Sequence, residues 1–443
     1  MLSIALSTRW HALKPQLTVM GYYGVGLLLM RGVSLLLLPL LTHALTPDEY
    51  GELELLLSVI NLGSLLLGFG LVEALYRFAG VVAQSERRAV VARAMGLAWL
   101  IALAALPLCW LAAPLVQGWL PLATPLSHLR WVLVALPFEA VIAIPLAWLR
   151  MRDQARLFFL ATVGKTLLQT AMTLGGLALG WGVGGVLASG TLSCLLLALW
   201  LTRWQWRDSG IAWPGAMSWR LLGYGGPVLV SGLAGFALSG VDRFWLADVA
   251  GSSELAQYAV ASKLALAVGI LLQPFGLWWY PRRFQLLGEA NGREDNARIS
   301  VLGATMGFLI AGLVGVSAPW LITWLTPPSY HGASQWIPPL VLAMAVRNVS
   351  DLLNLGCFFG ERSHSQMAIN LGTSLAGLLL FTLLIPAYGV AGVVWSLLLV
   401  YGGRAVAFYL VSQRLLWLPY RLSPLLASAL LSLALVGAGQ WHA

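Results

Sequence analysis

The sequence is poor in charge: aspartate, glutamate, lysine and arginine make up 10% of its 443 residues, against roughly 25% in an ordinary soluble protein. This deficit excludes a soluble globular domain. A hydrophobic content of 59% and a mean hydropathy of +0.82 indicate an integral membrane protein. The apolar runs have the length of bilayer-spanning helices, about 20 residues, whereas a barrel strand needs only about 10 residues of alternating polarity. We therefore predict an all-α membrane fold.

Residues that carry chemistry are also scarce. The three cysteines, Cys109, Cys194 and Cys357, fall in separate predicted helices, and the six histidines are scattered. We therefore expect no disulfide, no metal site and no cofactor. No GxxxxGK[ST] loop exists for ATP hydrolysis. Because no long loop offers a catalytic centre and no Ser/His/Asp triad can be assembled, we predict that the chain is not an enzyme.

The formal net charge of +9 comes from basic residues in short loops. They are concentrated in alternate loops, while the opposite set holds Arg130 and little else. This asymmetry is typical of membrane topology and predicts a cytoplasmic N-terminus in a multi-pass membrane protein. It argues against a nucleic-acid partner.

Twelve apolar segments predict membrane helices, and a thirteenth remains open. The expected helices cover 17–42, 50–79, 92–116, 129–149, 157–179, 183–201, 221–249, 254–280, 299–325, 334–359, 367–385 and 390–411, and the open one covers 424–439. A polar break in the middle divides them into six-helix bundles at 1–202 and 219–414. Residues 203–218 are then a cytoplasmic linker, and 415–443 a C-terminal segment.

The two halves resemble each other in sequence. In the first, a long helix ends in the turn THALTPDEYGELE at 42–54; in the second, the corresponding turn is LADVAGSSELAQYAV at 246–260. Both lead into the next helix through a glutamate and a tyrosine. The pattern indicates a parallel duplication, which is common in transporters with a central site.

Several charged residues lie inside the predicted helices. Charges facing lipid are costly, so these must face protein or a water-filled cavity. Arg347 and Asp351 are four residues apart and can pair along one helix, whereas the adjacent Asp242 and Arg243 point about 100° apart and should not pair with each other. The basic residues without a local acidic partner are Arg31, Lys165, Lys263 and Arg404. They predict a net positive central cavity for an anionic substrate; the alternative is that each bridges helices or caps backbone carbonyls.

Residues 31–77 and 221–264 carry a family resemblance through an acidic-Tyr-Gly element at 49–51 and an Asp-Arg pair at 242–243 ahead of a Tyr-Ala-Val-Ala element at 258–261. The sequence resembles the polysaccharide transporter (O-antigen flippase) branch of the multidrug/oligosaccharidyl-lipid/polysaccharide exporter superfamily. One departure is His43, where the family often has a basic residue. The resemblance implies a fold like that of the multidrug (MATE) transporters, with two bundles around a central cavity and alternating access.

The resemblance also implies a location in the bacterial inner membrane and a substrate, an undecaprenyl-pyrophosphate-linked oligosaccharide flipped through the lipid bilayer from the cytoplasmic to the outer leaflet. It further implies polysaccharide polymerase and chain-length proteins as partners. The residues expected to contact phosphate are Arg31, Lys263 and Arg404, followed by Arg243, Arg347 and Lys165. The residues expected to tune charge or couple ions are Asp242, Asp351, Glu139 and Glu54.

Three alternatives remain open. A drug/cation antiporter of the same superfamily would need an apolar or acidic cavity, whereas basic residues outnumber acidic ones in these helices. A lipid II flippase usually has two more helices. A membrane-embedded polysaccharide polymerase or ligase needs a large loop outside the membrane with catalytic polar residues.

Overall fold

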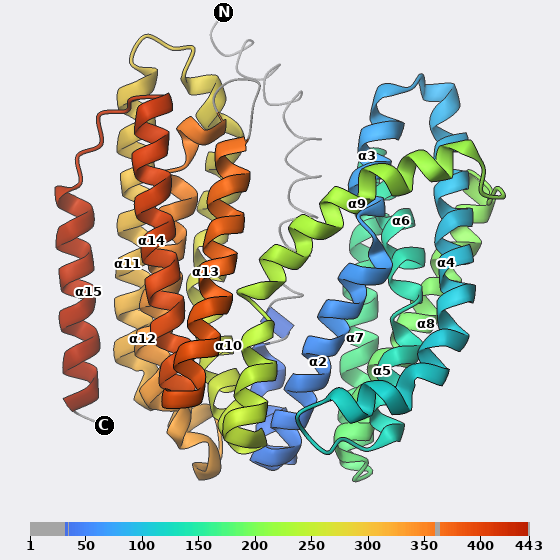
Figure 1. The fold of residues 1–443 in the computed structure, drawn as a ribbon, viewed down its shortest axis with the longest axis horizontal. Helices are drawn as coiled ribbons and strands as arrows, with labels where there is room; N and C mark the ends of the chain where they lie inside the picture. The colour runs from blue at the N-terminus through green and yellow to red at the C-terminus, as the bar shows by residue number, and fades with distance from the viewer. Residues whose placement is uncertain (1–31, 34, 359–363, 442–443) are drawn as a thin grey trace, which may run out of the picture. The chain divides into compact units, whose positions relative to one another are not determined.

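The computed structural model describes residues 32–33, 35–358 and 364–441. These residues form helices and no strands (Figure 1). Within them, nine helical segments are long and apolar enough to cross a membrane. One of these, Ala216–Gly276, is 61 residues long and contains most of the two predicted helices 221–249 and 254–280. The prediction of an all-α membrane protein is confirmed, and the count of twelve spans stays a prediction.

Contacts between residues divide the chain into two compact units. The first unit contains Leu56–Leu233, and the second contains Leu38–Leu55 and Ala234–Ala443. Leu38–Leu55 therefore groups with the second unit, because its side chains bond to residues of that unit, as described below. The six-helix bundles and the linker expected from the sequence stay a prediction.

The first unit is a bundle built around an apolar core. Buried residues of α3, α4, α6 and α8 form this core, with alanine and valine at many of the contacts. Its helices are the second part of α2 (Pro47–Gly68), α3 (Leu71–Val81), α4 (Gln84–Trp119), α5 (Leu126–Ala135), α6 (Phe138–Met151), α7 (Ala155–Ala178), α8 (Gly182–Asp208) and most of α9 (Ala216–Ala237).

Two predicted helices are interrupted in this unit. The helix expected at 50–79 breaks where Phe69 and Gly70 take positive φ angles of 46° and 61°. Helix α9 lies against this break so closely that a Cβ atom on Gly225 would be 2.1 Å from the Phe69 carbonyl oxygen. The helix expected at 129–149 divides into α5 and α6 beside Pro137. A proline removes a backbone donor and disturbs the preceding turn, which explains this second break.

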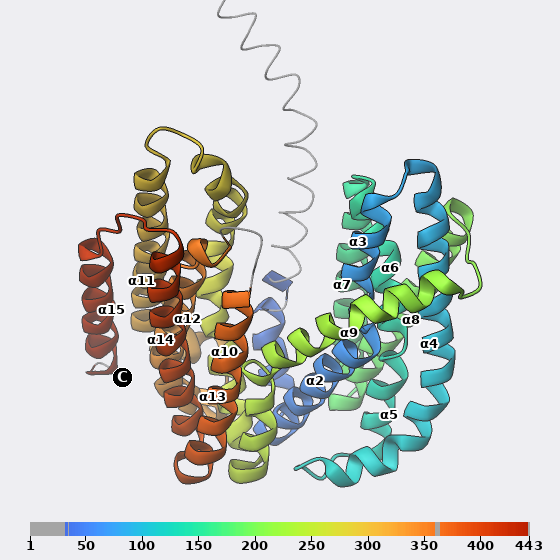
Figure 2. The ribbon, with the colours of Figure 1, turned by 45° about the horizontal axis from the view of Figure 1, so that its top comes forward.

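The second unit is a larger set of packed helices. Helix α12 packs against α10, α11 and α14, while α13 packs against α14 and α15 packs against α11. Figure 2 shows this arrangement from a second direction. The elements are α10 (Val241–Leu286), α11 (Gly292–Leu325), η1 (Pro328–Trp336), α12 (Ile337–Leu352), η2 (Leu355–Phe358), α13 (His364–Tyr388), α14 (Val390–Leu415) and α15 (Ser423–Trp441).

Two of these elements differ from expectation. The predicted helix 334–359 is α-helical only over α12, with 3-10 turns on both sides. The open segment 424–439 forms α15, which approaches α11 so closely that a Cβ atom on Gly312 would be 3.1 Å from the Ser432 Cα atom. Whether α15 crosses the membrane stays a prediction.

Helix α10 bends where the sequence predicts a polar turn. Gly251 has a φ angle of 81° inside the helix, a conformation that favours glycine. The beginning of α2 lies directly against this kink: a Cβ atom on Gly51 would be 2.0 Å from the Ser252 carbonyl oxygen, and the Ser252 hydroxyl donates to Asp48. This close approach brings charged residues of α2 and α10 together.

Candidate functional site

The candidate charges predicted from the sequence lie in different places. Arg31 lies outside the described residues. Lys165 on α7 and Glu139 on α6 are partly buried in the first unit, and both are near enough to the Cys194 thiol to act on it electrostatically. The remaining candidates belong to the second unit and form two polar clusters there.

The first group, called the Glu54 cluster, joins α2 to both sides of the α10 kink. The Glu54 side chain is only 2% exposed, and its carboxylate forms ion pairs with Lys263 and, at 3.7 Å, with Arg243. A buried carboxylate is costly unless opposite charges pair with it. These two cations therefore stabilise the ionised Glu54 side chain in the protein interior. The cluster consists of Tyr50, Glu54, Asp242, Arg243, Tyr258 and Lys263.

Aromatic residues enclose the Lys263 ammonium group. Its Nζ atom donates to the Tyr50 hydroxyl at 2.7 Å and lies 5.0 Å from the centre of the same ring. Tyr50 in turn packs edge-on against Tyr330, whose hydroxyl donates to the Leu45 carbonyl oxygen at 2.8 Å. Leu38–Leu55 is therefore fixed to the second unit by packing and hydrogen bonds as well as by charge.

Asp242 completes the charge balance of the Glu54 cluster. The buried Tyr258 hydroxyl donates to the Asp242 carboxylate, while the adjacent Arg243 pairs with Glu54. The two neighbours thus bind different partners, as their separation around the helix predicts. With two acidic and two basic side chains, the cluster has no formal net charge.

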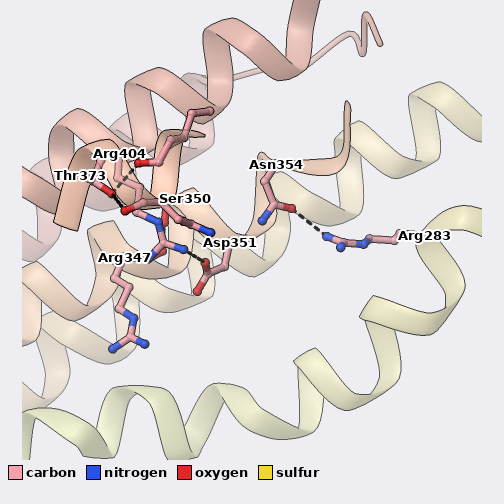
Figure 3. A network of polar contacts seen from close by, with 9 residues as sticks. Arg283, Arg347, Ser350, Asp351, Asn354, Thr373 and Arg404 are labelled. Carbon is pink, nitrogen blue, oxygen red and sulfur yellow. Dashed lines mark hydrogen bonds and ion pairs between the residues drawn. The ribbon is translucent and has the colours of Figure 1, made fainter. Parts of the chain in front are cut away.

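The second group, called the Asp351 cluster, lies between α10, α12 and α14 (Figure 3). The Arg404 Nη2 atom lies 3.1 Å from the Asp351 Oδ1 atom. The Arg283 Nη1 atom donates to the Asn354 Oδ1 atom at 3.0 Å. The cluster consists of Arg283, Arg347, Asp351, Asn354, Tyr401 and Arg404.

The position of Arg347 corrects the pairing expected from spacing alone. The ion pair of Asp351 is made with Arg404, and in Figure 3 the Arg347 guanidinium points away from that pair. Arg347 is exposed and lies 5.8 Å from the centre of the Tyr401 ring. Because Arg404 of α14 forms the ion pair with the Asp351 carboxylate, the guanidinium group of Arg347 is available to bind another anion.

Arg283 is a member of this cluster that sequence reasoning missed. The sequence places it in a basic loop, yet in the structure it is only 7% exposed. Its Cζ atom lies 5.0 to 5.1 Å from the ring centres of Tyr280, Phe284 and Phe358. The only signal in the sequence is the aromatic run that precedes Arg282 and Arg283. An aromatic run of this kind does not distinguish a buried arginine from a loop arginine that sets the orientation of the protein in the membrane.

The Asp351 cluster is electropositive and partly open. The cluster contains three arginines and a single carboxylate, which gives a formal charge of +2. The Asp351 side chain is 37% exposed, and the buried Nε atoms of Arg283 and Arg404 have no hydrogen-bond partner. Guanidinium groups bind phosphate and carboxylate oxygens through paired N–H donors. Such an arrangement is suited to anion binding.

The described residues contain no group of three or more metal-ligating side chains. Residues 19–287 match the family described as "Polysaccharide biosynthesis protein". The chain belongs to this family. The match includes the Glu54 cluster and reaches Arg283 in the Asp351 cluster, and it agrees with the relationship that residues 31–77 and 221–264 predict. No curated protein matches the sequence.

Solved structures similar to this family member include lipid flippases and multidrug transporters. Lipid II flippase MurJ in an inward closed conformation has a TM-score of 0.74 and 12% identity, over 95% of this chain and 92% of the other. MATE in complex with MaD3S has a TM-score of 0.62 and 14% identity, over 92% and 96%.

A third similar structure is a MOP superfamily transporter from Pyrococcus furiosus. For that protein, a reversed polarity of the binding pocket is said to suggest a different function. It has a TM-score of 0.57 and 13% identity, over 92% of this chain and 96% of the other. At such low identities the likeness establishes the fold alone. The predicted MATE-like fold is confirmed.

Proposed function

We propose that this protein is a flippase that moves an undecaprenyl-pyrophosphate-linked oligosaccharide across the bacterial inner membrane. The observation that carries the proposal is the open, electropositive Asp351 cluster in a multi-pass member of the polysaccharide biosynthesis family. A pyrophosphate group is anionic and needs cationic donors, while a polyprenyl tail can stay in the lipid.

Arg347, Arg404 and Arg283 are the proposed pyrophosphate-binding residues. Arg347 is exposed, and a charge facing lipid would be costly, so we propose that its guanidinium faces water. The Arg404 Nη2 atom lies 3.1 Å from the Asp351 Oδ1 atom. We infer that Asp351 keeps the Arg404 side chain oriented, and that phosphate oxygens compete with it for the guanidinium.

The Asp351 cluster lies near the C-terminal end of α10, which carries Arg282 and Arg283, and Arg293 and Arg298 follow at the beginning of α11. By the distribution of basic residues, we propose that this end of α10 is cytoplasmic and that the N-terminus is on the same side. A cluster there would meet a lipid-linked substrate in the leaflet where it is made. The polymerase and chain-length proteins stay proposed partners on the opposite side.

We propose that Lys263 and Arg243 contribute less to phosphate binding than the arginines of the Asp351 cluster. Both already pair with the buried Glu54, and either must leave this carboxylate before it can bind a phosphate. Glu54 and Asp242 are proposed to tune the charge of the Glu54 cluster, and ion coupling through them stays a prediction. Arg31, Lys165 and Glu139 also stay predictions.

Two other functions have some support. A lipid II flippase would share the pyrophosphate chemistry, and the MurJ structure is similar in fold. A drug/cation antiporter would share the MATE fold, but the formal charge of +2 at the Asp351 cluster favours an anionic substrate. An enzymatic role such as polymerase or ligase is not proposed.

Gene deletion and complementation test the proposal. Deletion should abolish the surface polysaccharide and cause its lipid-linked intermediate to accumulate on the inner leaflet. Wild-type protein and Arg414→Ala, which alters an exposed arginine at the end of α14, should restore the polymer. The double variant Arg347→Ala/Arg404→Ala should not restore it. Unchanged surface polysaccharide after deletion would contradict the proposal.

A further inference from the structure

The first unit contains a polar pocket that plays no part in the proposed transport site. It has a volume of about 620 Å³ and lies between the beginning of α4 and the turn that joins α6 to α7. Its polar lining comes from the first turns of α4 and from the α6–α7 turn. The lining includes Gln84, Ser85, Arg87, Arg88, Arg152 and Asp153.

Positive charge is in excess in this pocket. Three arginines line it, but only one carboxylate, Asp153, does so. Arg152 pairs with Asp208 of α8, whose other carboxylate oxygen accepts a hydrogen bond from the Trp148 indole N–H at 2.8 Å. Asp208 is therefore occupied by partners in the pocket wall, which leaves Arg87 and Arg88 without a comparable counterion.

The two remaining arginines are held differently. The Arg87 Nε atom donates to the Val82 carbonyl oxygen at 3.4 Å, a contact that ties this side chain to the α3–α4 turn. Arg88 also lines the pocket, and its side chain is exposed. Both belong to the first turns of α4, where the helix dipole also favours an anion. The anchoring of Arg87 reduces the conformational entropy that ligand binding would cost.

We propose that this pocket binds a phosphate-bearing group. Planar guanidinium groups match phosphate oxygens with paired donors, and Ser85 and Gln84 add neutral hydrogen-bonding groups. The phosphate can belong to an anionic phospholipid of the adjacent leaflet or to a free phosphate compound, since both present the same oxygens. Basic residues beside a membrane attract anionic head groups by about 1 kcal/mol each.

Binding measurements on the full chain distinguish the two sources. In one arm, the protein is placed in nanodiscs containing phosphatidylglycerol or phosphatidylcholine, and bound lipid is counted by native mass spectrometry. In the other arm, detergent-purified protein carrying Arg347→Ala/Arg404→Ala, which removes the proposed pyrophosphate site of the Asp351 cluster, is titrated with inorganic pyrophosphate. The pocket variant is Arg87→Ala/Arg88→Ala. Its matched control is Arg93→Ala/Arg203→Ala, which removes two exposed arginines of the same unit outside the pocket.

The control should bind like wild type, and the pocket variant should lose affinity on the order of tenfold or more, since charge-assisted hydrogen bonds are lost. An arginine-dependent loss for phosphatidylglycerol alone identifies a lipid headgroup, and a loss for pyrophosphate alone identifies a free anion. If the pocket variant unfolds, the single variant Arg88→Ala at the exposed position replaces it. Equal binding by pocket and control variants in both arms, or no binding by wild type, would overturn the proposal.

Discussion

The Glu54 and Asp351 clusters both place a carboxylate among basic side chains of the second unit, yet they differ in exposure and in balance. The Glu54 side chain is 2% exposed and that of Asp351 is 37% exposed. The Glu54 cluster has no formal net charge, while the Asp351 cluster carries +2. An unpartnered buried Nε atom occurs in both, at Arg243 in the first and at Arg283 and Arg404 in the second.

The difference shows that a cation inside a membrane helix is not by itself evidence of a substrate site. A buried carboxylate with two cationic partners is already neutralised, and breaking the group leaves an uncompensated charge. An exposed ion pair is weaker and exchanges partners readily. We therefore assign structural support to the Glu54 cluster and anion binding to the Asp351 cluster.

The largest effect is expected from removal of Glu54. Glu54→Ala leaves Lys263 and Arg243 without their shared carboxylate, which should lower the free energy of unfolding by about 3–5 kcal/mol. Thermal unfolding in detergent measures the change. Glu254→Gln, which alters an exposed carboxylate of α10, serves as the control and should change stability little. If the Glu54→Ala protein were as stable as the control, the structural role that we assign to the Glu54 cluster would be wrong.

A smaller loss of stability is expected at the edge of the Glu54 cluster. Tyr258→Phe removes the hydroxyl that donates to buried Asp242 and should destabilise the protein by roughly 1.5–3 kcal/mol, the range for a hydrogen bond to a charged group. Tyr388→Phe, at an exposed tyrosine of α13, is the matched control. Identical unfolding temperatures for the two variants would show that the Asp242 hydrogen bond contributes little.

At the Asp351 cluster, function should change more than stability. Arg404→Ala should reduce transport of the lipid-linked glycan by about tenfold, because at least one charge-assisted contact to the substrate is lost. Its unfolding free energy should fall by no more than about 1 kcal/mol, since the ion pair with Asp351 is partly exposed. Full transport by Arg404→Ala would count against the assignment. Arg414→Ala on the same helix should leave both measurements unchanged.

The smallest effect is expected from Asp351 itself. Asp351→Asn removes the acidic competitor for Arg404 and raises the formal charge of the cluster by one. Affinity for inorganic pyrophosphate should rise roughly threefold, which corresponds to the energy of an exposed ion pair. Isothermal titration calorimetry on the purified protein measures it. A weaker affinity would indicate that Asp351 positions Arg404 more than it competes with phosphate.

The sequence was sufficient for the membrane class and the family, because apolar run length and short motifs are local properties. It also named most charged residues of the two clusters as candidates, whose roles stay a prediction. The sequence did not predict which charged residues pair with each other. Glu54 and Lys263 lie far apart in the chain and meet only because α2 docks on the kink of α10. Arg347 and Asp351 have ideal helical spacing, yet Arg404 from α14 takes the carboxylate. Arg283 resembles a loop arginine until tertiary packing buries it.

The central claim is that the Asp351 cluster, rather than the Glu54 cluster, binds pyrophosphate. The most direct test measures pyrophosphate affinity in Arg347→Ala/Arg404→Ala and in Glu54→Gln/Lys263→Met, both made in the Arg87→Ala/Arg88→Ala background so that the pocket of the first unit does not contribute. The second variant removes one charge of each sign and keeps the Glu54 cluster formally neutral. We predict a loss of about tenfold or more in the first variant and wild-type affinity in the second. Wild-type affinity in the first variant together with a loss in the second would contradict the account.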